Sequence, residues 1–392
     1  MDNAMKMEAG RNPAGFDPLW PEVHRGGAGL EAIRGEWAEL ARRDRCGHYF
    51  HHPQWLGTAL DWLAGDADIW FFLFRDRDGN GRAVIPLQRR GGEWRFPRDD
   101  QTSYVDLVAV DEEAARGALQ ALPAVAALHG KGRIHLDRVL EGANALLAPD
   151  DARVEPVPGK RSDWLDLEGG SEAVLGRVGR HFRKELRRKG RRAEECGEVA
   201  FRIDRAGEAS AEERTAALDD FLALESAGWK GRAGTAIARD PRLLAFYRAV
   251  LEAAEGEPAG TPRWRIHRLF IGGECVAAQL ALEAGSTVYL LKIAFHEGYA
   301  AASPGLLAIA RLLESLDGEP GIRWLTFVTG NRHQDVWRPR ELGVHAVTLY
   351  TPDLAGRAAR LLDRTRSELR GVRAAVRRYL GRRGRSSATG EQ

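Results

Sequence analysis

A lysine inside an apolar stretch is the first residue of this sequence that could do chemistry. Lys292 stands in the middle of the run from Val288 to Phe295, whose other residues are almost all apolar. Burying an ammonium group is costly unless it is paired or faces a wet cleft. In a cleft, it could stabilise a developing oxyanion or bind an acidic ligand. The alternative is that Lys292 points outward from an edge strand.

The predicted helix start at Ser303-Pro304-Gly305 is a second candidate for chemistry. Ser303 suits the N-cap position, and Pro304 at the first helical position gives up no needed donor. Gly305 lets a ligand approach the backbone closely. The free N–H groups and the positive dipole end of such a helix can hold a phosphate group. The alternative is that this tripeptide is only a good helix start.

No residue is set up as a covalent nucleophile or as part of a metal site. The nearest approach to a nucleophile elbow, Gly285-Ser286-Thr287, lacks the Gly-x-Ser-x-Gly frame. Three cysteines far apart in the chain favour neither a disulfide framework nor a zinc cluster. A histidine-rich stretch without metal-ligand spacing is expected in a surface loop, and its members are His48, His51 and His52. Direct attack by an acceptor, without a metal, is the favoured mechanism.

The elements that must position these residues follow one another from residue 171 onward. Apolar spacing and turn residues there predict a β, α, α, β, β, β, α, β, α, β series after an initial helix. That initial helix is predicted as one unit over 171–195, with Ser171 as its N-cap. The series comprises a strand at 198–203, helices at 211–227 and 241–254, strands at 263–271, 275–283 and 287–295, a helix at 304–316, a strand at 324–328, a helical piece at 332–337 and a strand at 344–350.

The first half of the chain repeats a similar order: helices, a hairpin, a third strand, a helix and short strands. Its predicted strands lie at 68–75, 83–87, 105–110, 133–139, 153–157 and 163–167. At about 150 residues per domain, a chain of 392 residues suits two or three domains. We predict an α/β (α+β) fold of two tandem domains, each a mixed twisted sheet flanked by helices. The predicted parts are a leader over 1–25, domains over 26–168 and 169–352, and a basic helix and tail over 353–392.

This order of elements resembles that of the GNAT acyltransferase superfamily. Three segments resemble the CelD/BcsL-type acetyltransferases, which are GNAT-like proteins associated with cellulose or other exopolysaccharide biosynthesis: Gly-Trp-Lys-Gly at 228–231, Val-Tyr-x-x-Lys at 288–292 and Tyr-x-x-x-Ser-Pro-Gly at 299–305. The basic segment 181–192 also resembles their signature. The resemblance covers about 40–350 and is strongest over 177–330. The Fem-type aminoacyl transferases of peptidoglycan synthesis share the tandem architecture.

The resemblance implies tandem GNAT-like acyl-CoA N-acyltransferase domains with acetyl-CoA or another acyl-CoA as co-substrate. The strand 287–295 would pair with the pantetheine amides and bulge, and the helix start at 303–305 would hold the pyrophosphate. The donor site would then comprise Ile293, Ser303, Pro304, Gly305 and Leu306. Of the superfamily's Gln/Arg-x-x-Gly-x-Gly/Ala turn, only the last position, Gly305, fits this sequence.

The resemblance also implies roles at the acceptor side. Glu225 would take the proton of the attacking group, Lys292 would stabilise the oxyanion, and Tyr289 would protonate the departing thiolate. The acceptor would contact Trp229, Lys230, Tyr299 and Arg183. Structural alternatives stay open, with Tyr289 and Trp229 in the core, Tyr299 in loop packing, and Arg183 on a solvated face.

Three hypotheses for the function follow. The first is acyl transfer to an amino or hydroxyl group of a sugar or cell-envelope precursor. The second is Fem-like aminoacyl transfer from charged tRNA, against which stands the lack of a long helical hairpin insertion in the sequence. The third is an inactive GNAT scaffold in polysaccharide synthesis, which the incomplete turn motif keeps open.

The charge balance conceals two basic segments. The net charge is only +2, from 58 basic and 56 acidic residues, so no specific nucleic-acid partner is expected. The segment 357–385, however, has eleven arginines against two acidic residues, a net charge of +9, and 177–192 has nine basic residues against one acidic residue. Apolar residues line one face of the C-terminal segment, which is typical of a helix that binds a membrane surface or a partner. We expect a cytoplasmic protein, with peripheral contact to the inner membrane or to a polysaccharide synthase through this helix.

Overall fold

The computed structural model describes residues 18–366 and Glu368, apart from Arg45, Ala64, Asp66, Arg98 and 255–260. The N-terminal half contains β1 (Trp20–Arg25), α1 (Gly26–Arg43), η1 (Tyr49–His51), α2 (Pro53–Trp62), β2 (Asp68–Arg75), β3 (Gly81–Arg90), β4 (Glu93–Arg95), β5 (Val108–Ala109), α3 (Glu112–Ala126), β6 (Arg133–Leu140), η2 (Asn144–Leu147) and β7 (Arg153–Asp166).

The C-terminal half contains α4 (Gly170–Arg177), α5 (Arg180–Cys196), β8 (Val199–Arg205), α6 (Ala211–Ala227), α7 (Trp229–Arg232), η3 (Ile237–Arg239), α8 (Pro241–Ala253), β9 (Arg263–Ile271), β10 (Glu274–Ala284), β11 (Thr287–Phe295), η4 (Glu297–Tyr299), α9 (Pro304–Leu316), β12 (Trp324–Thr326), η5 (Asp335–Trp337) and β13 (Arg340–Tyr350). A further helix covers 354–366. Among the described residues, no helix is both long and apolar enough to span a bilayer.

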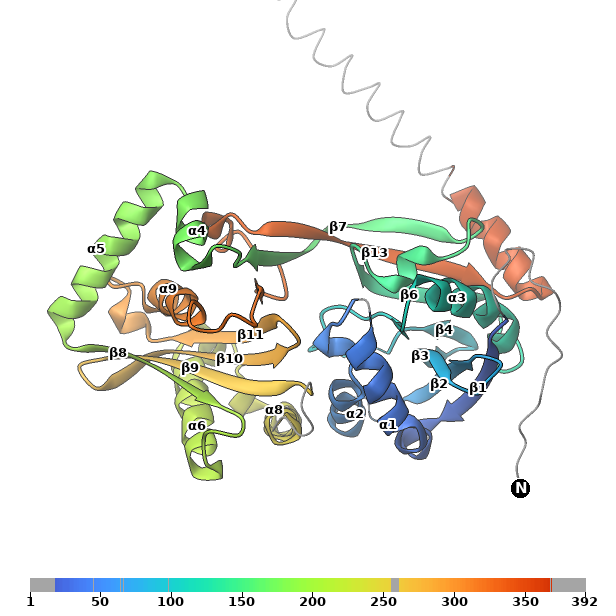
Figure 1. The fold of residues 1–392 in the computed structure, drawn as a ribbon, viewed down its shortest axis with the longest axis horizontal. Helices are drawn as coiled ribbons and strands as arrows, with labels where there is room; N and C mark the ends of the chain where they lie inside the picture. The colour runs from blue at the N-terminus through green and yellow to red at the C-terminus, as the bar shows by residue number, and fades with distance from the viewer. Residues whose placement is uncertain are drawn as a thin grey trace, which may run out of the picture.

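One path of paired strands joins both halves, in the order β1-β2-β3-β4-β6-β13-β7-β12-β11-β10-β9-β8, and β5 pairs with β3 beside this path. The long strands β7 and β13 run between the halves (Figure 1). The predicted mixed α/β architecture, a twisted sheet flanked by helices, is confirmed. The predicted domain boundary at 168/169 falls just after β7.

Strand β7 corrects the sequence analysis, which expected two short strands at 153–157 and 163–167. The segment between them holds Pro158 and Gly159, which are poor strand residues. The ladder with β13 shifts register there, so that Gly343 pairs with Arg161 and His345 with Pro156. Because this irregularity leaves the residues between them outside the ladder, one strand continues through the interruption.

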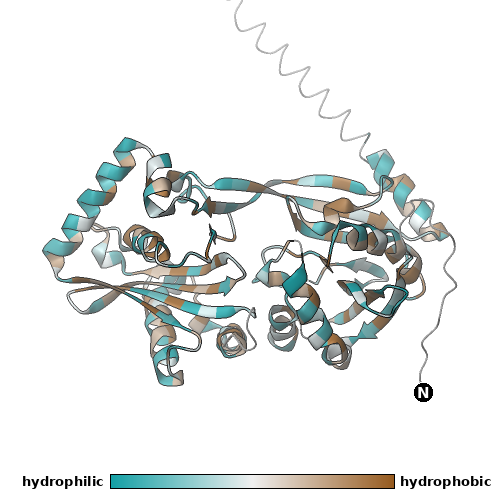
Figure 2. Ribbon diagram, viewed as in Figure 1, coloured by the Kyte–Doolittle hydropathy of each residue, from teal (hydrophilic) through white to brown (hydrophobic). Residues whose placement is uncertain are grey.

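The two faces of the C-terminal sheet carry different helices (Figure 1). Helices α6 and α8 cover one face, and α9 packs on the other with α4 and α5 beside it. In Figure 2 the strands and α9 carry hydrophobic residues, whereas α5 is largely hydrophilic. The core on the α6 side also contains Tyr49, Phe50 and Trp55 from the N-terminal half. The two halves therefore share a hydrophobic core.

The helices around the site were mostly predictable. Those at 211–227 and 304–316 have the expected bounds. The single helix expected over 171–195 is wrong, because the chain breaks at Val178 and Gly179 into α4 and α5. Ser171 is not an N-cap but lies inside α4, where its N–H donates to Oδ1 of Asp317 at 2.6 Å. This contact ties α4 to the end of α9.

Candidate functional site

The strands β11 and β12 separate partway along their length. They pair in parallel only from Thr287 to Tyr289, opposite Trp324 to Thr326. Beyond this point the N–H of Phe327 donates to the carbonyl of Asp163 in β7 at 3.0 Å, so the chain turns away from β11. Among the residues that the structure describes, no strand pairs with the C-terminal part of β11 on the β12 side, so its backbone edge is free there.

A bulge in β11 sets which side chains face the α6 side. Lys292 pairs with Leu280 and Leu290 with Ala281, so Leu291 is an extra residue. Tyr289 and Lys292 are three positions apart, yet they pair with Leu282 and Leu280, which share one face. Because of the bulge, Tyr289 and Lys292 therefore lie on the same face of the sheet. The bulge that the resemblance implied for this strand is present.

Lys292 lies half-buried between α6 and α8. Its Nζ atom is 5.8 Å from the ring centroid of Tyr247, and it has no hydrogen-bond or ion-pair partner among the described residues. Burial lowers the pKa of Lys292, the charge of Lys230 lowers it further, and Glu225 opposes the shift. An ammonium group that is partly desolvated and unpaired costs stability. Such a group is poised to bind negative charge that forms nearby.

Glu225 is nearly fully buried at the end of α6 and is held by two donors. Its Oε1 accepts from Nζ of Lys230 at 2.6 Å, and its Oε2 accepts from the N–H of Ile237 at 2.8 Å. The side chain is 4% exposed, so both contacts keep a buried carboxylate satisfied. Glu225 can accept a proton from a ligand only if Lys230 moves aside.

Several predicted residues meet in a small recess between α6, α7 and the end of β11. The recess has a volume of about 20 Å³, and Glu225, Trp229, Lys230, Ile293 and Phe295 line it. Trp229 is 58% exposed, so it is a surface aromatic residue and not a core residue. Its backbone N–H donates to Glu297, which fastens the α6–α7 turn to the segment after β11.

Tyr289 lies at the point where the strands separate, but it is closed off. Its side chain is 0% exposed, and its hydroxyl lies 3.3 Å from Nδ1 of His48. Phe50 and Trp164 pack their rings against it edge-on. Burial raises the pKa of the Tyr289 phenol. This setting favours the alternative that Tyr289 is a core residue.

The histidine-rich stretch is not a surface loop, which corrects the sequence analysis. His51 and His52 are buried, and His48 contacts the C-terminal half through Tyr289. Burial lowers the pKa of His48 to about 4, so this imidazole is neutral at pH 7. The aromatic neighbours Tyr49, Phe50 and Trp55 were the available sequence signal, because such a cluster is typical of a core.

The start of α9 has an unusual geometry. Ser303 occupies the N-cap position with φ of 51°, and its side chain does not cap the helix, contrary to the prediction. Its hydroxyl instead donates to the carbonyl of Ala300 at 3.3 Å. A Cβ atom at Gly305 would lie 3.1 Å from the Phe295 ring, so glycine permits close packing against β11. Pro304 stands at the first helical turn as expected, followed by half-buried Leu306.

The remaining predicted residues lie farther along this face. Tyr299 donates its hydroxyl to Oε2 of Glu274 at 2.8 Å, in the segment between β11 and α9. Arg183 lines a groove of about 640 Å³ between α5 and α9. The basic helix α5 also contacts the segment before α9, because Nζ of Lys189 donates to the carbonyl of Ala301 at 2.9 Å. Neither Tyr299 nor Arg183 lines the recess beside Lys292.

A large cavity between the two halves adjoins the end of β12. It measures about 1210 Å³, and its lining includes Tyr104 from the N-terminal half, Arg242 from α8 and the segment 328–330. Val328 has φ of 64°, which is strained for a β-branched residue and is typical of functional sites. Tyr247 donates its hydroxyl to Gln101 of the cavity wall at 2.8 Å. Because Tyr247 also faces Lys292, its side chain lies between the lysine and this wall.

Residues 180–335 match the family model of the acetyltransferase (GNAT) domain. This segment runs from α5 to η5 and contains the separated strands, the bulge and Lys292. Over 180–335 the match shows an acyltransferase domain of the GNAT type, which confirms the predicted enzyme class. Among the described residues, no group of three or more His, Cys, Asp or Glu side chains could hold a metal ion. No curated protein matches the chain in sequence.

Solved structures with a similar fold cover both halves of the chain. The crystal structure of FemX is 14% identical, with a TM-score of 0.56, and covers 84% of this chain and 98% of that chain. The C-terminal domain of a putative lysylphosphatidylglycerol synthetase from Agrobacterium fabrum is 14% identical over 86% of this chain and 96% of its own, with a TM-score of 0.50. The L-PGS of Bacillus licheniformis is 15% identical over 84% and 94%, also at 0.50. At these identities the likeness concerns the fold.

Proposed function

We propose that this chain transfers an acyl group from an acyl-CoA to an amino or hydroxyl group of a sugar or cell-envelope precursor. The observation that carries the proposal is the free backbone edge of β11 beyond Tyr289, beside the unpaired ammonium group of Lys292. An extended, amide-bearing chain can add to such an edge through backbone hydrogen bonds. The start of α9 lies close to the same strand and can receive a diphosphate.

The donor side of the site would be built by β11 and α9. The pantetheine arm would lie along the edge from Leu290 to Ile293. The backbone N–H of Gly305 would hold the diphosphate, whereas the N–H of Leu306 already donates to the carbonyl of Ser303 at 3.0 Å. Bound acyl-CoA would supply a thioester carbonyl. Lys292 would stabilise the negative charge that develops on its oxygen, which requires the protonated ammonium.

The acceptor side requires a group that takes a proton. As the acceptor nitrogen or oxygen attacks, its bond to the acyl carbon forms and the carbon–sulfur bond breaks. Glu225 would take the proton from the acceptor once Lys230 moves toward the acceptor or the solvent. The departing thiolate would take a proton from the solvent, to which Glu225 would release its own. Trp229, which is exposed beside this pair, offers a flat surface to a sugar ring.

The cavity between the halves supports a large polar acceptor. Its lining holds charged side chains of both signs, among them Asp137, Lys160 and Arg242. Ligand pockets commonly measure about 300–1,000 Å³, so this cavity can hold a glycan precursor of more than one sugar. The link to cellulose or another exopolysaccharide rests on the resemblance of the segments 228–231, 288–292 and 299–305.

Aminoacyl transfer from charged tRNA is the second candidate. The similarity to FemX and the exposed arginines of α5 favour it. The two candidates differ in the donor, so the protein can be offered acetyl-CoA, longer acyl-CoAs and aminoacyl-tRNA in parallel. A scaffold without activity would bind none of them.

Isothermal titration with acetyl-CoA and longer acyl-CoAs, followed by release of free thiol with amino-sugar acceptors, tests the proposal. We expect saturable binding of at least one acyl-CoA. Lys292→Met should retain this binding and lose thiol release, whereas Lys131→Met, at an exposed lysine of the N-terminal half, should lose neither. If no acyl-CoA binds to the protein with Ser303 and Gly305 intact, the proposal is wrong.

A further inference from the structure

The helix at 354–366 has two unlike faces. Gly356, Ala359 and Asp363 are buried, and their spacing of three and four residues places them on one side of a helix with 3.6 residues per turn. Leu354 and Leu361, seven residues apart, lie on the opposite side. The buried side packs on the N-terminal half, and the opposite side faces the solvent.

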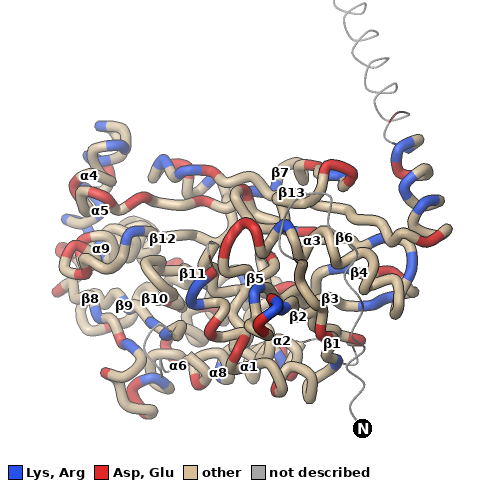
Figure 3. The backbone as a smooth tube through the Cα atoms, turned by 45° about the vertical axis from the view of Figure 1, so that its right-hand side comes forward, with Lys and Arg blue, Asp and Glu red and all other residues tan. Residues whose placement is uncertain are grey.

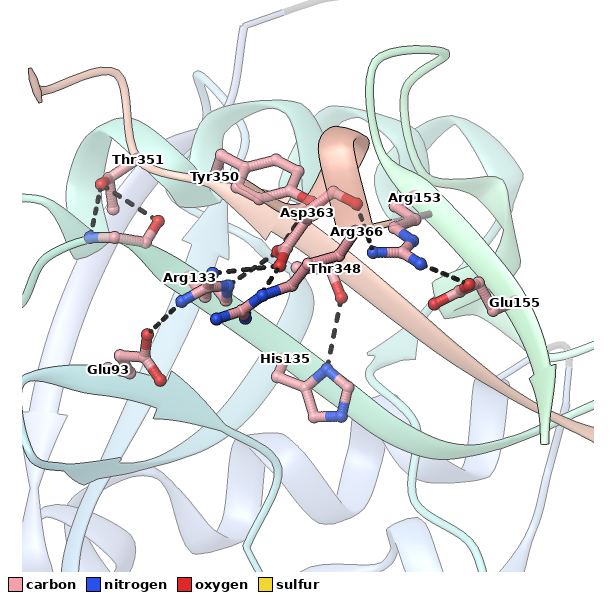
Figure 4. A network of polar contacts seen from close by, with 11 residues as sticks. Glu93, Arg133, His135, Arg153, Glu155, Thr348, Tyr350, Thr351, Asp363 and Arg366 are labelled. Atoms are coloured by element: carbon pink, nitrogen blue, oxygen red, sulfur yellow. Dashed lines mark hydrogen bonds and ion pairs between the residues drawn. The ribbon is translucent and has the colours of Figure 1, made fainter. Parts of the chain in front are cut away.

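Hydrogen bonds and an ion pair of Asp363 determine which side of the helix 354–366 faces the solvent (Figure 4). Asp363 accepts from Nε of Arg133 at 2.7 Å and from Nη2 of the same residue at 3.0 Å. The hydroxyl of Tyr350 donates to Oδ2 of Asp363 at 3.2 Å. The Arg133 guanidinium holds the pKa of Asp363 below its usual value. The helix is therefore fastened at its inner face by a half-buried ion pair with several hydrogen bonds.

The outer face combines exposed leucines with arginines. Leu354, Leu361 and Leu362 are 83%, 66% and 53% exposed, which makes them three of the most exposed large apolar side chains of the described chain. Exposed Arg357 and Arg364 follow Leu354 and Leu361 by three residues each. Figure 3 shows the basic residues of this helix in blue at one end of the molecule. Clustered exposed apolar residues of this kind mark an interaction site.

The sequence after residue 366 repeats the same pattern. Apolar residues recur at helical spacing, and seven more arginines follow; the apolar residues are Leu369, Val372, Val376, Tyr379 and Leu380. These residues lie outside the described part of the chain, so the pattern is one of sequence. Counted at 3.6 residues per turn, they continue the stripe begun by Leu354 and Leu361.

We propose that the outer face of 354–366 binds the surface of an anionic lipid bilayer. The leucines would enter the boundary between headgroups and acyl chains, and the arginines would contact anionic headgroups. A nucleic acid would pair with the arginines but leave the leucines in water. A second copy of this chain, docked symmetrically, would set arginines against arginines. This proposal does not depend on acyl transfer.

Flotation of the full chain with vesicles tests the proposal. Vesicles of phosphatidylglycerol and phosphatidylcholine in equal parts should bind the protein, and vesicles of phosphatidylcholine alone should not. Binding should weaken as salt rises, because charges near the surface are screened. The double variant Leu361→Gln/Leu362→Gln should bind at least about tenfold more weakly, because each substitution removes an apolar side chain that would enter the lipid.

The matched control is Val336→Gln, at an apolar residue of η5 in the C-terminal half that is 41% exposed. This variant should float like the wild-type chain. All three proteins should melt at the same temperature, because the substituted side chains make few contacts in the fold. Equal flotation of the double variant and the wild type, or wild-type binding to tRNA but not to vesicles, would overturn the proposal.

Discussion

Helices α3 and α9 occupy corresponding places in the two halves, and they begin in opposite ways. Helix α3 precedes β6, which pairs in parallel with the earlier strand β4. Helix α9 precedes β12, which pairs in parallel with the earlier strand β11. At α3, Asp111 caps the helix by accepting from the N–H of Ala114 at 2.8 Å, and Glu112 and Glu113 follow in the first turn. At α9, Ser303 provides no side-chain cap and no acidic residue follows in the first turn.

The two halves also differ in the space that lies beyond each pair of parallel strands, which the chain fills in the N-terminal half and leaves open in the C-terminal half. Beyond β4, the guanidinium of Arg138 donates to the carbonyls of Pro97 at 2.7 Å and Asp99 at 3.2 Å, so the chain itself fills this space. Beyond Tyr289, no described strand pairs with the edge of β11, and Lys292 contacts the ring of Tyr247 but no described carboxylate or hydrogen-bond acceptor. A helix start that is already capped and acidic repels a phosphate group, whereas an uncapped one attracts it. Within the described residues, this difference agrees with the proposal that the donor binds to the C-terminal half.

The largest effect is expected from Lys292→Met. If the ammonium stabilises the oxyanion, its loss should lower turnover about a hundredfold with a small change in acyl-CoA affinity. Steady-state thiol release and titration calorimetry measure the two quantities separately. A variant that loses less than threefold in turnover would contradict this role for Lys292.

The same variant should be more stable than the wild type at neutral pH. The pKa of Lys292 is lower in the folded chain than its usual 10.5, so the unfolded chain binds this proton more tightly. The wild-type stability therefore rises as pH increases from the lowered pKa toward 10.5, and the advantage of Lys292→Met shrinks over that range. Urea unfolding at neutral and alkaline pH measures this difference.

Ser303→Asp makes the start of α9 resemble that of α3. The new carboxylate should weaken acyl-CoA binding about tenfold, because it competes with the diphosphate for the helix N-terminus. The same substitution should change the stability of the fold only slightly, because the left-handed backbone at Ser303 does not direct a side chain onto the free N–H groups of the helix. Ser303→Asn has nearly the same shape without the charge, so it should lose much less affinity.

The reciprocal test is Asp111→Asn in α3. This substitution keeps a capping side chain but removes the charge that faces Arg82 at 2.6 Å, so it should cost less than about 1 kcal/mol of stability. The acyl-CoA affinity should not change. If Asp111→Asn alters that affinity as much as Ser303→Asp does, the two halves do not differ in the way proposed.

Many of the helices and strands of the C-terminal half could be predicted from the sequence. The apolar spacing of 211–227 and 304–316 and the turns between 263 and 295 gave the elements of the C-terminal half, because these signals are local. The single strand β7 could not be predicted. Its prolines and glycine are poor strand residues, and only the irregular pairing with the distant β13 accommodates them.

At the candidate site, too, single residues could be predicted from the sequence, whereas contacts between distant segments could not. Lys292 can be identified from the sequence because a lysine is conspicuous in an apolar strand, and in the structure the charges of Glu225 and Lys230 act on its pKa. The pairing of Glu225 with Lys230 depends on the α6–α7 turn and left no sequence signal. The contact of His48 with Tyr289 could not be predicted, because it joins two segments that lie 241 positions apart. Contacts between distant segments leave little trace in a single sequence.

The buried carboxyl group of Asp106 tests whether the N-terminal half has a structural role. Burial and the nearby charge of Asp44 raise the pKa of Asp106 to about 8. The folded chain therefore holds this proton more tightly than the unfolded chain. Its contribution to stability is complete below about pH 4 and is lost as pH rises through about 8, with a slope of at most about 1.4 kcal/mol per pH unit.

Asp106→Asn should flatten this decline, because the amide does not titrate. The variant should also be less stable at every pH, since its single oxygen replaces two that accept from the N–H groups of Ala145 and Asn144. Urea unfolding at pH values between 5 and 9 measures the slope. The rate of acyl transfer should not change with the pH dependence of the stability. A decline of unchanged slope in the variant would assign the pH dependence to another group, and a matching change in rate would link Asp106 to the site.

The smallest effect is expected where the two halves meet, at Tyr289. Tyr289→Phe removes the hydroxyl that lies 3.3 Å from His48 and leaves the ring in its aromatic packing. If Tyr289 is a core residue, the variant should lose about 1 kcal/mol of stability, the usual contribution of one buried hydrogen bond. Turnover should then change by less than about threefold, because an enclosed phenol cannot reach a departing thiolate. A large loss of turnover at unchanged acyl-CoA affinity would instead show that the enclosing aromatic residues part during the reaction, and that the N-terminal half contributes through His48 to the chemistry.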